Sequence, residues 1–149
     1  MSSGKPLIRL MEHRDLDEIL EVEKSCFRSP WTRHMFEDEL YNSNAYYYVI
    51  DVDGKIAGYA GFWKIIDEAH ITNIAVHRDY RRRGYGKALV KTLLDKAKEL
   101  EIIAVTLEVR VSNTAAISLY ESFGFVSSGV RRGYYSDNNE DALIMWLKL

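Results

Sequence analysis

The sequence from residue 81 to residue 89 reads Arg81-Arg82-Arg83-Gly84-Tyr85-Gly86-Lys87-Ala88-Leu89. A β-branched run at residues 71–76 precedes this basic, glycine-containing stretch, and apolar residues at helical spacing follow it at 88–100. A turn between a strand and a helix can bind a pyrophosphate, because the first amides of a helix have no partner inside it and the helix dipole adds positive potential. The stretch therefore predicts an anion-binding turn.

Two common nucleotide-binding motifs do not match this stretch. A P-loop would require a glycine at Arg81 and a hydroxyl residue at Ala88. A dinucleotide-binding fingerprint would require a glycine at Leu89. Mg-nucleotide and dinucleotide chemistry are therefore disfavoured. A plain loop before a helix, with arginines that only face solvent, stays open as the second interpretation of residues 81–89.

Length and composition are those of an ordinary globular protein. The chain has 149 residues, of which 47% are hydrophobic and 28% charged, and we expect one domain spanning residues 1–149. The net charge of -2 argues against binding nucleic acid through bulk charge. No apolar run is long enough to cross a membrane, so we expect neither nucleic acid nor membrane as a direct partner, and we favour a monomer.

Cysteine and histidine usage indicates a reduced compartment and no metal site. Cys26 is the one cysteine, so the chain cannot form an internal disulfide, and the N-terminus at residues 1–6 lacks the apolar core of a signal peptide. We therefore expect a cytoplasmic protein. The four histidines and Cys26 show no zinc-ligand spacing, and we expect no metal. A buried, inert thiol is favoured for Cys26 over an acyl-accepting nucleophile.

The element order predicts a mixed α+β fold. Helices are expected to begin at caps provided by Asp15, Thr32 and Asn113, and Gly124 ends the last of them. Asp53-Gly54 predicts a hairpin turn. The nearly continuous apolar strand at 102–109 is expected to be buried on both faces. The resulting order is β-α-α-β-β-β-α-β-α-β-β, closed by a hairpin of strands at 125–131 and 143–149 with a long polar tip.

This order and several motifs resemble the GNAT (Gcn5-related N-acetyltransferase) superfamily, and within it the bacterial RimI-type subgroup. The acetyl-CoA signature of the superfamily, Gln/Arg-x-x-Gly-x-Gly/Ala, corresponds to residues 81–86. Asn73-Ile74-Ala75-Val76 also matches the subgroup. The more specific motifs are Leu107-Glu108-Val109-Arg110, Leu119-Tyr120-Glu121 and Arg131-Arg132-Gly133-Tyr134-Tyr135. The resemblance covers nearly the whole chain. It implies a mostly antiparallel central sheet of about seven strands with helices on both faces.

The resemblance also implies an activity and a cofactor site. Members of the subgroup transfer an acetyl group from acetyl-CoA to the N-terminal alanine of the eighteenth protein of the small ribosomal subunit. The pyrophosphate is expected on the backbone amides of Arg82, Arg83, Gly84, Tyr85, Gly86 and Lys87. The pantetheine arm is expected to pair, like an added strand, with the backbone of Ile74, Ala75 and Val76. Asn113 is expected both to cap its helix and to contact CoA.

Two residues are candidates for catalysis by match to the subgroup. Glu108 is the candidate general base, and its place in an apolar strand suggests that burial raises its pKa toward the working range. The alternatives for Glu108 are an ion pair with an arginine such as Arg110 or a place on an exposed strand face. Tyr120 is the candidate general acid, which gives a proton or a hydrogen bond to the CoA sulfur; by position alone it would be a core aromatic residue.

The acceptor peptide is expected between two segments. Tyr134 and Tyr135, at the tip of the last hairpin, suit gripping a peptide near its terminus. Phe27, Pro30 and Trp31 could wall the other side, or could equally be packing residues. Acidic stretches at 37–39 and 137–141 are most often solvated faces, and as a hypothesis they steer a basic ribosomal-protein tail.

Other functions stay open at this point. A GNAT enzyme that acetylates lysine side chains or a small amine is the alternative enzyme class. A non-catalytic acetyl-CoA-binding sensor is the alternative outside enzymes, and the presence of both Glu108 and Tyr120 argues against it.

Overall fold

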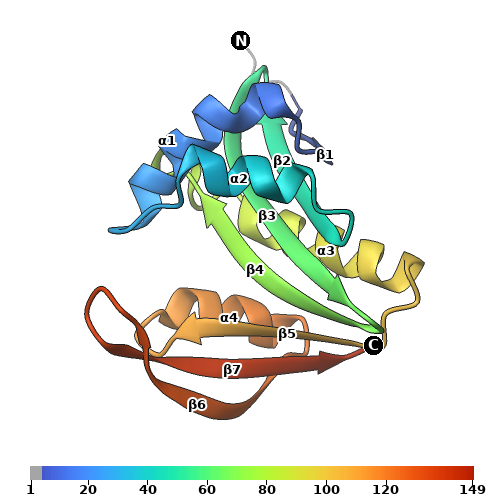
Figure 1. Cartoon of the computed structure of the whole chain (residues 1–149), viewed down its shortest axis with the longest axis vertical. Coiled ribbons are helices and arrows are strands. Elements are labelled where there is room, and N and C mark those ends of the chain that lie inside the picture. The colour runs from blue at the N-terminus through green and yellow to red at the C-terminus, as the bar shows by residue number, and fades with distance from the viewer. Residues whose placement is uncertain (1–4) are drawn as a thin grey trace.

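A single twisted sheet runs through the molecule (Figure 1). The computed structural model describes residues 5–149; residues 1–4, part of the segment 1–6 considered above as a signal peptide, lie outside the described residues. Seven strands lie in the order β1-β2-β3-β4-β5-β7-β6. Their bounds are β1 (Leu7–Leu10), β2 (Ala45–Val52), β3 (Lys55–Ile65), β4 (Glu68–Val76), β5 (Ala104–Arg110), β6 (Val126–Tyr135) and β7 (Glu140–Lys148). The expected mixed α+β order is confirmed.

Helices cover both faces of the sheet. Helices α1 (Leu16–Cys26) and α2 (Arg33–Leu40) lie on one face, blue and cyan in Figure 1, and bury Leu16, Ile19 and Phe36 against it. Helices α3 (Tyr85–Glu99) and α4 (Thr114–Ser122) pack against a second core that contains Leu89 and Tyr120. Two short 3-10 turns, η1 (His13–Asp15) and η2 (Arg78–Tyr80), precede α1 and the basic turn. Within residues 5–149, no helix is long and apolar enough to cross a membrane.

The sheet opens between β4 and β5. These parallel strands pair at only three positions, ending at His70–Thr106, and then diverge. Figure 1 shows them meeting near the C-terminus and splaying apart toward the opposite end. A bulge at Thr72 bends β4 just beyond the last pair, since Gly61 pairs with Asn73 but Phe62 pairs with Ile71. The second half of β4 therefore has one edge without a strand partner in the sheet.

Strand β5 is buried on one face, not on both as its composition suggested. Val105, Leu107 and Val109 are buried in the core beneath α3 and α4. The alternate residues Thr106, Glu108 and Arg110 are only half-buried. The expectation of burial on both faces is therefore wrong, because α1 and α2 cover β2–β4 and leave this side of β5 open.

Two of the three expected helix caps are confirmed. The Thr32 hydroxyl accepts the amide of Met35 at 3.3 Å, and the Asn113 side chain accepts the amide of Ala116 at 3.1 Å. Asp15 precedes α1, but its side chain makes no capping bond to that helix. The Asp15 carboxylate accepts the amide of Glu12 instead, at 2.8 Å.

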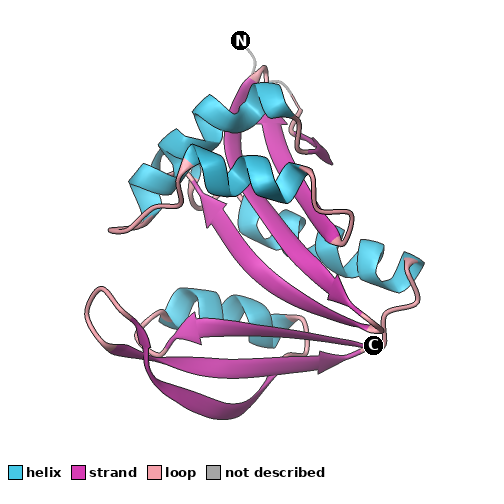
Figure 2. Ribbon diagram, in the orientation of Figure 1, coloured by secondary structure: helices cyan, strands magenta, loops and turns pink. Residues whose placement is uncertain are grey.

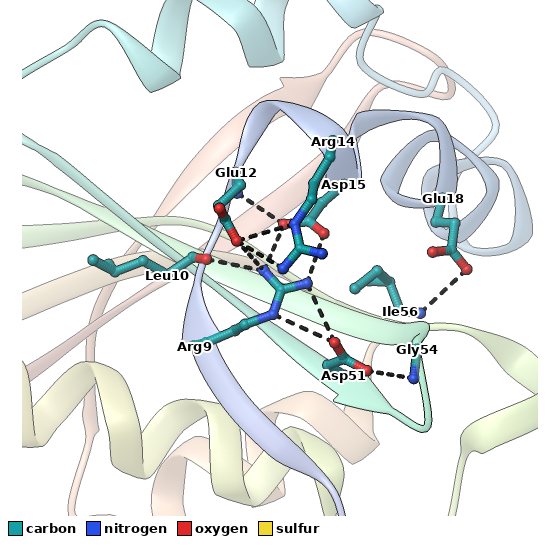
Figure 3. A network of polar contacts seen from close by, with 9 residues as sticks. All are labelled: Arg9, Leu10, Glu12, Arg14, Asp15, Glu18, Asp51, Gly54 and Ile56. Atoms are coloured by element: carbon teal, nitrogen blue, oxygen red, sulfur yellow. Dashed lines mark hydrogen bonds and ion pairs between the residues drawn. The ribbon is translucent and has the colours of Figure 1, made fainter.

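Asp15 belongs to a buried ion network that Figure 3 shows. The Arg9 guanidinium donates to both Asp15 oxygens, at 2.8 and 2.9 Å, and also reaches Asp51 on β2 at 3.3 Å. Burial opposes ionisation of Asp15, but the hydrogen bonds from Arg9 and from the Glu12 amide outweigh it and hold its pKa below the usual value. The network fixes the start of α1 against β1 and β2.

The last hairpin is longer than its sequence suggested. β6 continues to Tyr135 and β7 begins at Glu140, so Tyr134 and Tyr135 end a strand rather than occupy a polar tip. β7 lies between β5 and β6 and is thus an internal strand. Between the pairs Arg131–Ala142 and Tyr135–Glu140, β6 takes two more steps than β7. The resulting bulge is centred on Gly133, whose φ is +59°.

Candidate active site

The basic turn has the backbone shape of an anion site. Arg82 and Gly84 both adopt positive φ, +65° and +79°, and α3 begins directly after them at Tyr85. A Cβ at Gly84 would meet no atom within 4 Å, so its requirement for glycine comes from the left-handed backbone. Arg82, Arg83 and Lys87 are exposed. Alternating backbone conformations before a helix N-terminus turn several amides the same way, which favours an anion.

The open edge of β4 runs toward this turn. Ala75 directs its carbonyl at β3, since a Cβ on Gly58 would lie 2.6 Å from that oxygen. The Val76 carbonyl receives the Cys26 thiol at 3.2 Å and Arg81 Nε at 3.3 Å. Arg81 thereby ties the basic turn to the end of β4. The half-buried Cys26 thiol hydrogen-bonds to the Val76 carbonyl and also accepts a hydrogen bond from Arg81. The chain thus presents an unpaired strand edge that leads into an anion turn, which fits a CoA-like molecule.

Glu108 lies on the open face of β5 in a compact polar cluster. Its Oε1 atom is 2.7 Å from His70 Nε2, and the Tyr134 hydroxyl donates to the same oxygen at 3.3 Å. The Glu108 side chain is 10% exposed. The hydrogen bond from His70 outweighs burial and lowers the pKa of Glu108, so the expectation of a raised pKa is wrong. The alternative pairing with Arg110 is also wrong, since Arg110 bonds to Asp137 and Glu140.

The sequence did not single out His70. A lone histidine in a strand carries no local signal, and its role depends on β4 lying parallel to β5 with His70 opposite Thr106. Successive side chains of a strand point to opposite faces of the sheet, so Thr106 and Glu108 point to the same face. His70, which pairs with Thr106, points to that face as well. Together they line a hollow of about 330 Å³, with Thr106, Ser128, Arg131 and Ile144. A larger hollow of about 570 Å³ lies at the closed end of the splay and is lined by Ile103 and Trp146 but not by this pair.

Tyr120 lies on the other side of β5 from Glu108. It is 8% exposed and belongs to the core that contains Leu107, with its ring edge-on to Phe125 at 5.7 Å. Burial, and then the neighbouring Tyr135, raise the pKa of Tyr120 above its usual value. Among residues 5–149 its hydroxyl has no hydrogen-bond partner. Tyr120 is thus a buried phenol that keeps its proton.

Tyr134 and Tyr135 form one aromatic pair beside Glu108. Their rings meet edge to face at 5.0 Å, and the Arg110 guanidinium lies 4.0 Å over the Tyr135 ring. The bulge at Gly133 carries Tyr134 to the Glu108 carboxylate. Burial is the largest cause of the increase in the pKa of Tyr135 to about 12. Arg110, held by two carboxylates, therefore fixes the hairpin next to the polar cluster.

The expected second wall, between α1 and α2, lies at the same open end of the splay as the β6–β7 tip (Figure 2). Phe27 is 39% exposed and follows the last residue of α1. Trp31 is half-buried, packs on Phe36 at 5.2 Å and donates its amide to Glu23 at 2.8 Å. The position of Trp31 is explained by packing within the protein, whereas the side chain of Phe27 is exposed and can contact a ligand.

The acidic stretches are largely engaged within the protein. Glu39 accepts the Trp63 indole N–H at 2.7 Å, and Glu37 pairs with Arg33 at 3.6 Å. Asp137 and Glu140 pair with Arg110. These contacts reduce the free negative charge available to steer a basic peptide.

The fold and sequence are similar to known acetyltransferases. A Bacillus subtilis protein provisionally named as a ribosomal protein bS18-alanine N-acetyltransferase is 45% identical over 97% of each chain. The bS18-alanine N-acetyltransferase of Escherichia coli K12 is 38% identical, covering 95% of this chain and 97% of its own length. The crystal structure of the E. coli S18-alanine enzyme superposes with a TM-score of 0.89 at 37% identity, over 97% and 94% of the two chains. The profile of the Acetyltransferase (GNAT) family matches residues 16–125, and the chain belongs to this family.

Proposed function

We propose that the protein transfers the acetyl group of acetyl-CoA to the α-amine of the N-terminal alanine of ribosomal protein bS18. The relatives that carry this name match almost the whole chain. The observation that carries the proposal is the cluster of Glu108, His70 and Tyr134 at the mouth of the β4–β5 splay. It places a carboxylate–imidazole pair beside an unpaired strand edge that leads to an anion turn.

The donor is held by backbone groups more than by side chains. Amides at residues 82–87 bind the pyrophosphate at the N-terminus of α3, with Arg82, Arg83 and Lys87 as exposed cations around it. The backbone of Ile74 and the amide of Val76 pair with the pantetheine arm along the open edge of β4, because the Val76 carbonyl already accepts from Cys26 and Arg81. Asn113 caps α4 through Oδ1, which leaves its amide nitrogen available for CoA. When bound, acetyl-CoA supplies an activated acyl carbon and a thiol leaving group.

The acceptor amine loses a proton as its nitrogen bonds to the acyl carbon and the carbon–sulfur bond breaks. The lowered pKa of Glu108 keeps it ionised at neutral pH, but a carboxylate of low pKa is a weak base toward an amine. Once Glu108 is protonated, His70 Nε2, 2.7 Å away, can accept that proton in the tautomer that carries its ring hydrogen on Nδ1. We therefore assign proton removal to the Glu108–His70 pair, and the orientation of Glu108 to Tyr134.

Tyr120 stabilises the sulfur that leaves. It lies on the face of β5 opposite to Glu108, so the group assigned to the thiol and the group assigned to the amine come from different sides of the strand. With ordinary pKa values, full proton transfer from a phenol to a thiolate is uphill by about 2 kcal/mol. The raised pKa of Tyr120 increases that cost. Its hydroxyl therefore acts mainly as a hydrogen-bond donor to the thiolate, and the proton comes to the sulfur later from solvent.

The α-amine is the acceptor that this machinery suits. An α-amine has a pKa of about 7.7–8.0 and lysine about 10.4, so about a tenth of the α-amine is neutral at pH 7 against less than a thousandth of the lysine. A weak carboxylate base with a nearby imidazole is therefore sufficient to deprotonate the α-amine. Tyr134 belongs to the cluster, and Phe27 directly follows α1 in the segment that lies at the same open end of the splay, where a peptide terminus would enter.

The test uses three synthetic peptides with the first residues of bS18 and follows CoA release at saturating acetyl-CoA. The first peptide begins with a free alanine, the second with a free bulky residue, and the third with a formylated alanine. We expect turnover with the first, at least tenfold less with the second, and none with the third. Equal turnover of the free and formylated peptides would instead identify a lysine acetyltransferase.

A further inference from the structure

We propose that the buried carboxylate of Glu23 is a positioning residue for the acceptor side of the site. It holds the loop between α1 and α2 and the bulge of β4 in one arrangement, and so sets how well a peptide terminus binds. The inference rests on the proposed function, since it concerns the peptide that is acetylated. Glu23 lies in the last turns of α1, and within residues 5–149 it makes no hydrogen bond or ion pair with Glu108 or with the anion turn.

Glu23 anchors the loop directly. Its side chain is fully buried, with 1% of its surface exposed, and Oε1 accepts the Trp31 amide at 2.8 Å. Trp31 lies in the segment between α1 and α2, four residues after Phe27. The bond therefore joins the end of α1 to the far end of the loop. The Trp31 ring continues this anchor by packing on Phe36 of α2 at 5.2 Å.

The other carboxylate oxygen connects α1 to β3 and, through β3, to the bulge of β4. Glu23 Oε2 accepts the hydroxyl of Tyr59, a fully buried residue of β3. The Tyr59 hydroxyl in turn accepts from Asn73 Nδ2 at 3.2 Å. Asn73 lies directly after Thr72 in the β4 bulge, three residues beyond His70. One side chain thus connects the loop wall at Trp31 with the strand that carries His70.

The stability of the fold alone does not explain why a carboxylate is buried at position 23. Asp15 and Glu23 are the two buried acidic residues among residues 5–149, and Asp15 has a guanidinium partner. Glu23 is bonded to neutral donors, an amide and a phenol, and burial raises its pKa. A buried charge without a cation is costly, and an apolar residue of similar size is often equally stable at such a site. A side chain with two acceptor oxygens is needed here to join two donors from different elements.

The experiment measures steady-state kinetics of full-length Glu23→Gln, Glu23→Leu and Tyr59→Phe with the alanine-first peptide. We expect Glu23→Leu to raise the peptide KM about tenfold, equivalent to about 1.4 kcal/mol of peptide binding. The acetyl-CoA KM should stay within a factor of two, and so should kcat. Tyr59→Phe should raise the peptide KM less, because the bond to Trp31 remains. Glu23→Gln should restore most of the affinity, because its carbonyl oxygen can still accept the Trp31 amide.

Asp15→Asn is the matched control, because it alters the other buried acid at the opposite end of the same helix. It should lower stability and leave the peptide KM unchanged. If Asp15→Asn raised the peptide KM as much as Glu23→Leu does, Glu23 would be a structural residue only. An unchanged peptide KM in folded Glu23→Leu, or an equal rise in both KM values, would also overturn the inference.

A measurement on the unaltered protein covers the case in which the variants do not fold. Hydrogen exchange of the Trp31 amide should be slow for a loop residue and slower still with bound peptide. Exchange at the rate of an exposed loop would overturn the inference. Failure of the wild-type protein to acetylate any peptide would instead overturn the proposed function.

Discussion

His70 Nε2 lies 2.7 Å from Glu108 Oε1, although the two residues are 38 positions apart in the chain. The contact exists because β4 and β5 run parallel and begin to diverge just beyond His70. Each side chain is at the edge of the splay, with 28% of His70 and 10% of Glu108 exposed. The pair is therefore shielded enough from solvent to form a strong hydrogen bond, and it is still accessible to an amine.

Replacing Glu108 by glutamine should lower kcat with the alanine-first peptide about 10²–10⁴-fold, the usual range for a general base. Glutamine keeps the shape and the contact with Tyr134 but cannot accept the proton. The acetyl-CoA dissociation constant should not change, as measured by calorimetry. Wild-type kcat in Glu108→Gln would remove Glu108 from the mechanism.

Replacing His70 by glutamine should lower kcat about tenfold, because an amide can donate a hydrogen bond to Glu108 but cannot carry a proton. His13→Gln is the control, since His13 is an exposed histidine that pairs with Glu37 at 3.3 Å, outside the site. Equal activity of the His70 and His13 variants would mean that Glu108 works without the imidazole.

Tyr120→Phe should lower kcat about 10–100-fold, because a hydrogen bond to a charged group contributes about 1.5–3 kcal/mol. The peptide KM should not change, since Tyr120 faces the other side of β5. Tyr41→Phe, at a tyrosine that is 87% exposed, is the control. A rise in peptide KM with kcat unchanged would place Tyr120 in peptide binding.

Gly133→Ala should weaken peptide turnover by moving Tyr134. Its φ is +59°, which strains any residue that has a Cβ, and the added Cβ would lie 2.7 Å from Asn139 Oδ1, so the Asn139 side chain must also move. Gly54→Ala is the matched control, because Gly54 also has positive φ but an added Cβ meets nothing within 4 Å. Both variants should lose about 1 kcal/mol of stability, and only Gly133→Ala should lower kcat/KM for the peptide. If Gly133→Ala and Gly54→Ala had equal kcat/KM values for the peptide, the bulge at Gly133 would have no role in turnover.

Asp15→Asn should cost about 1.5–3 kcal/mol of unfolding free energy at pH 7, because it weakens the charged hydrogen bonds between Asp15 and the partly exposed Arg9. The pKa of Asp15 is lowered in the folded protein, so its contribution is present above the unfolded pKa of about 3.9 and is lost as pH falls through the folded pKa. Urea unfolding between pH 3 and 7 should show the difference between wild type and variant shrinking below pH 4. A pH-independent difference would contradict the assignment.

Features set by neighbouring residues could be predicted from the sequence. The Asp53-Gly54 turn and the caps at Thr32 and Asn113 need only local backbone partners, and all three are confirmed. Features set by distant partners could not. Asp15 has a cap-like sequence context, but Arg9 and Glu12 take its carboxylate. The apolar sequence of β5 does not reveal that the splay leaves one of its faces open.

The same distinction holds within the site. The sequence singles out Glu108 as a candidate, but the pKa of its carboxyl depends on His70, which only the parallel register of β4 and β5 brings near. The position of Tyr134 depends on a bulge that residue types do not reveal. The roles assigned to Glu108, Tyr120 and the CoA-binding residues stay predictions until kinetics are measured.

One peptide tests the central claim most directly. It carries a free N-terminal alanine and one internal lysine, and is incubated with acetyl-CoA and the wild-type protein at pH 7. Fragmentation by mass spectrometry then locates the acetyl group. The Glu108–His70 site predicts acetylation of the alanine α-amine with the lysine unmodified. Acetyl groups on the lysine with a free α-amine would contradict it.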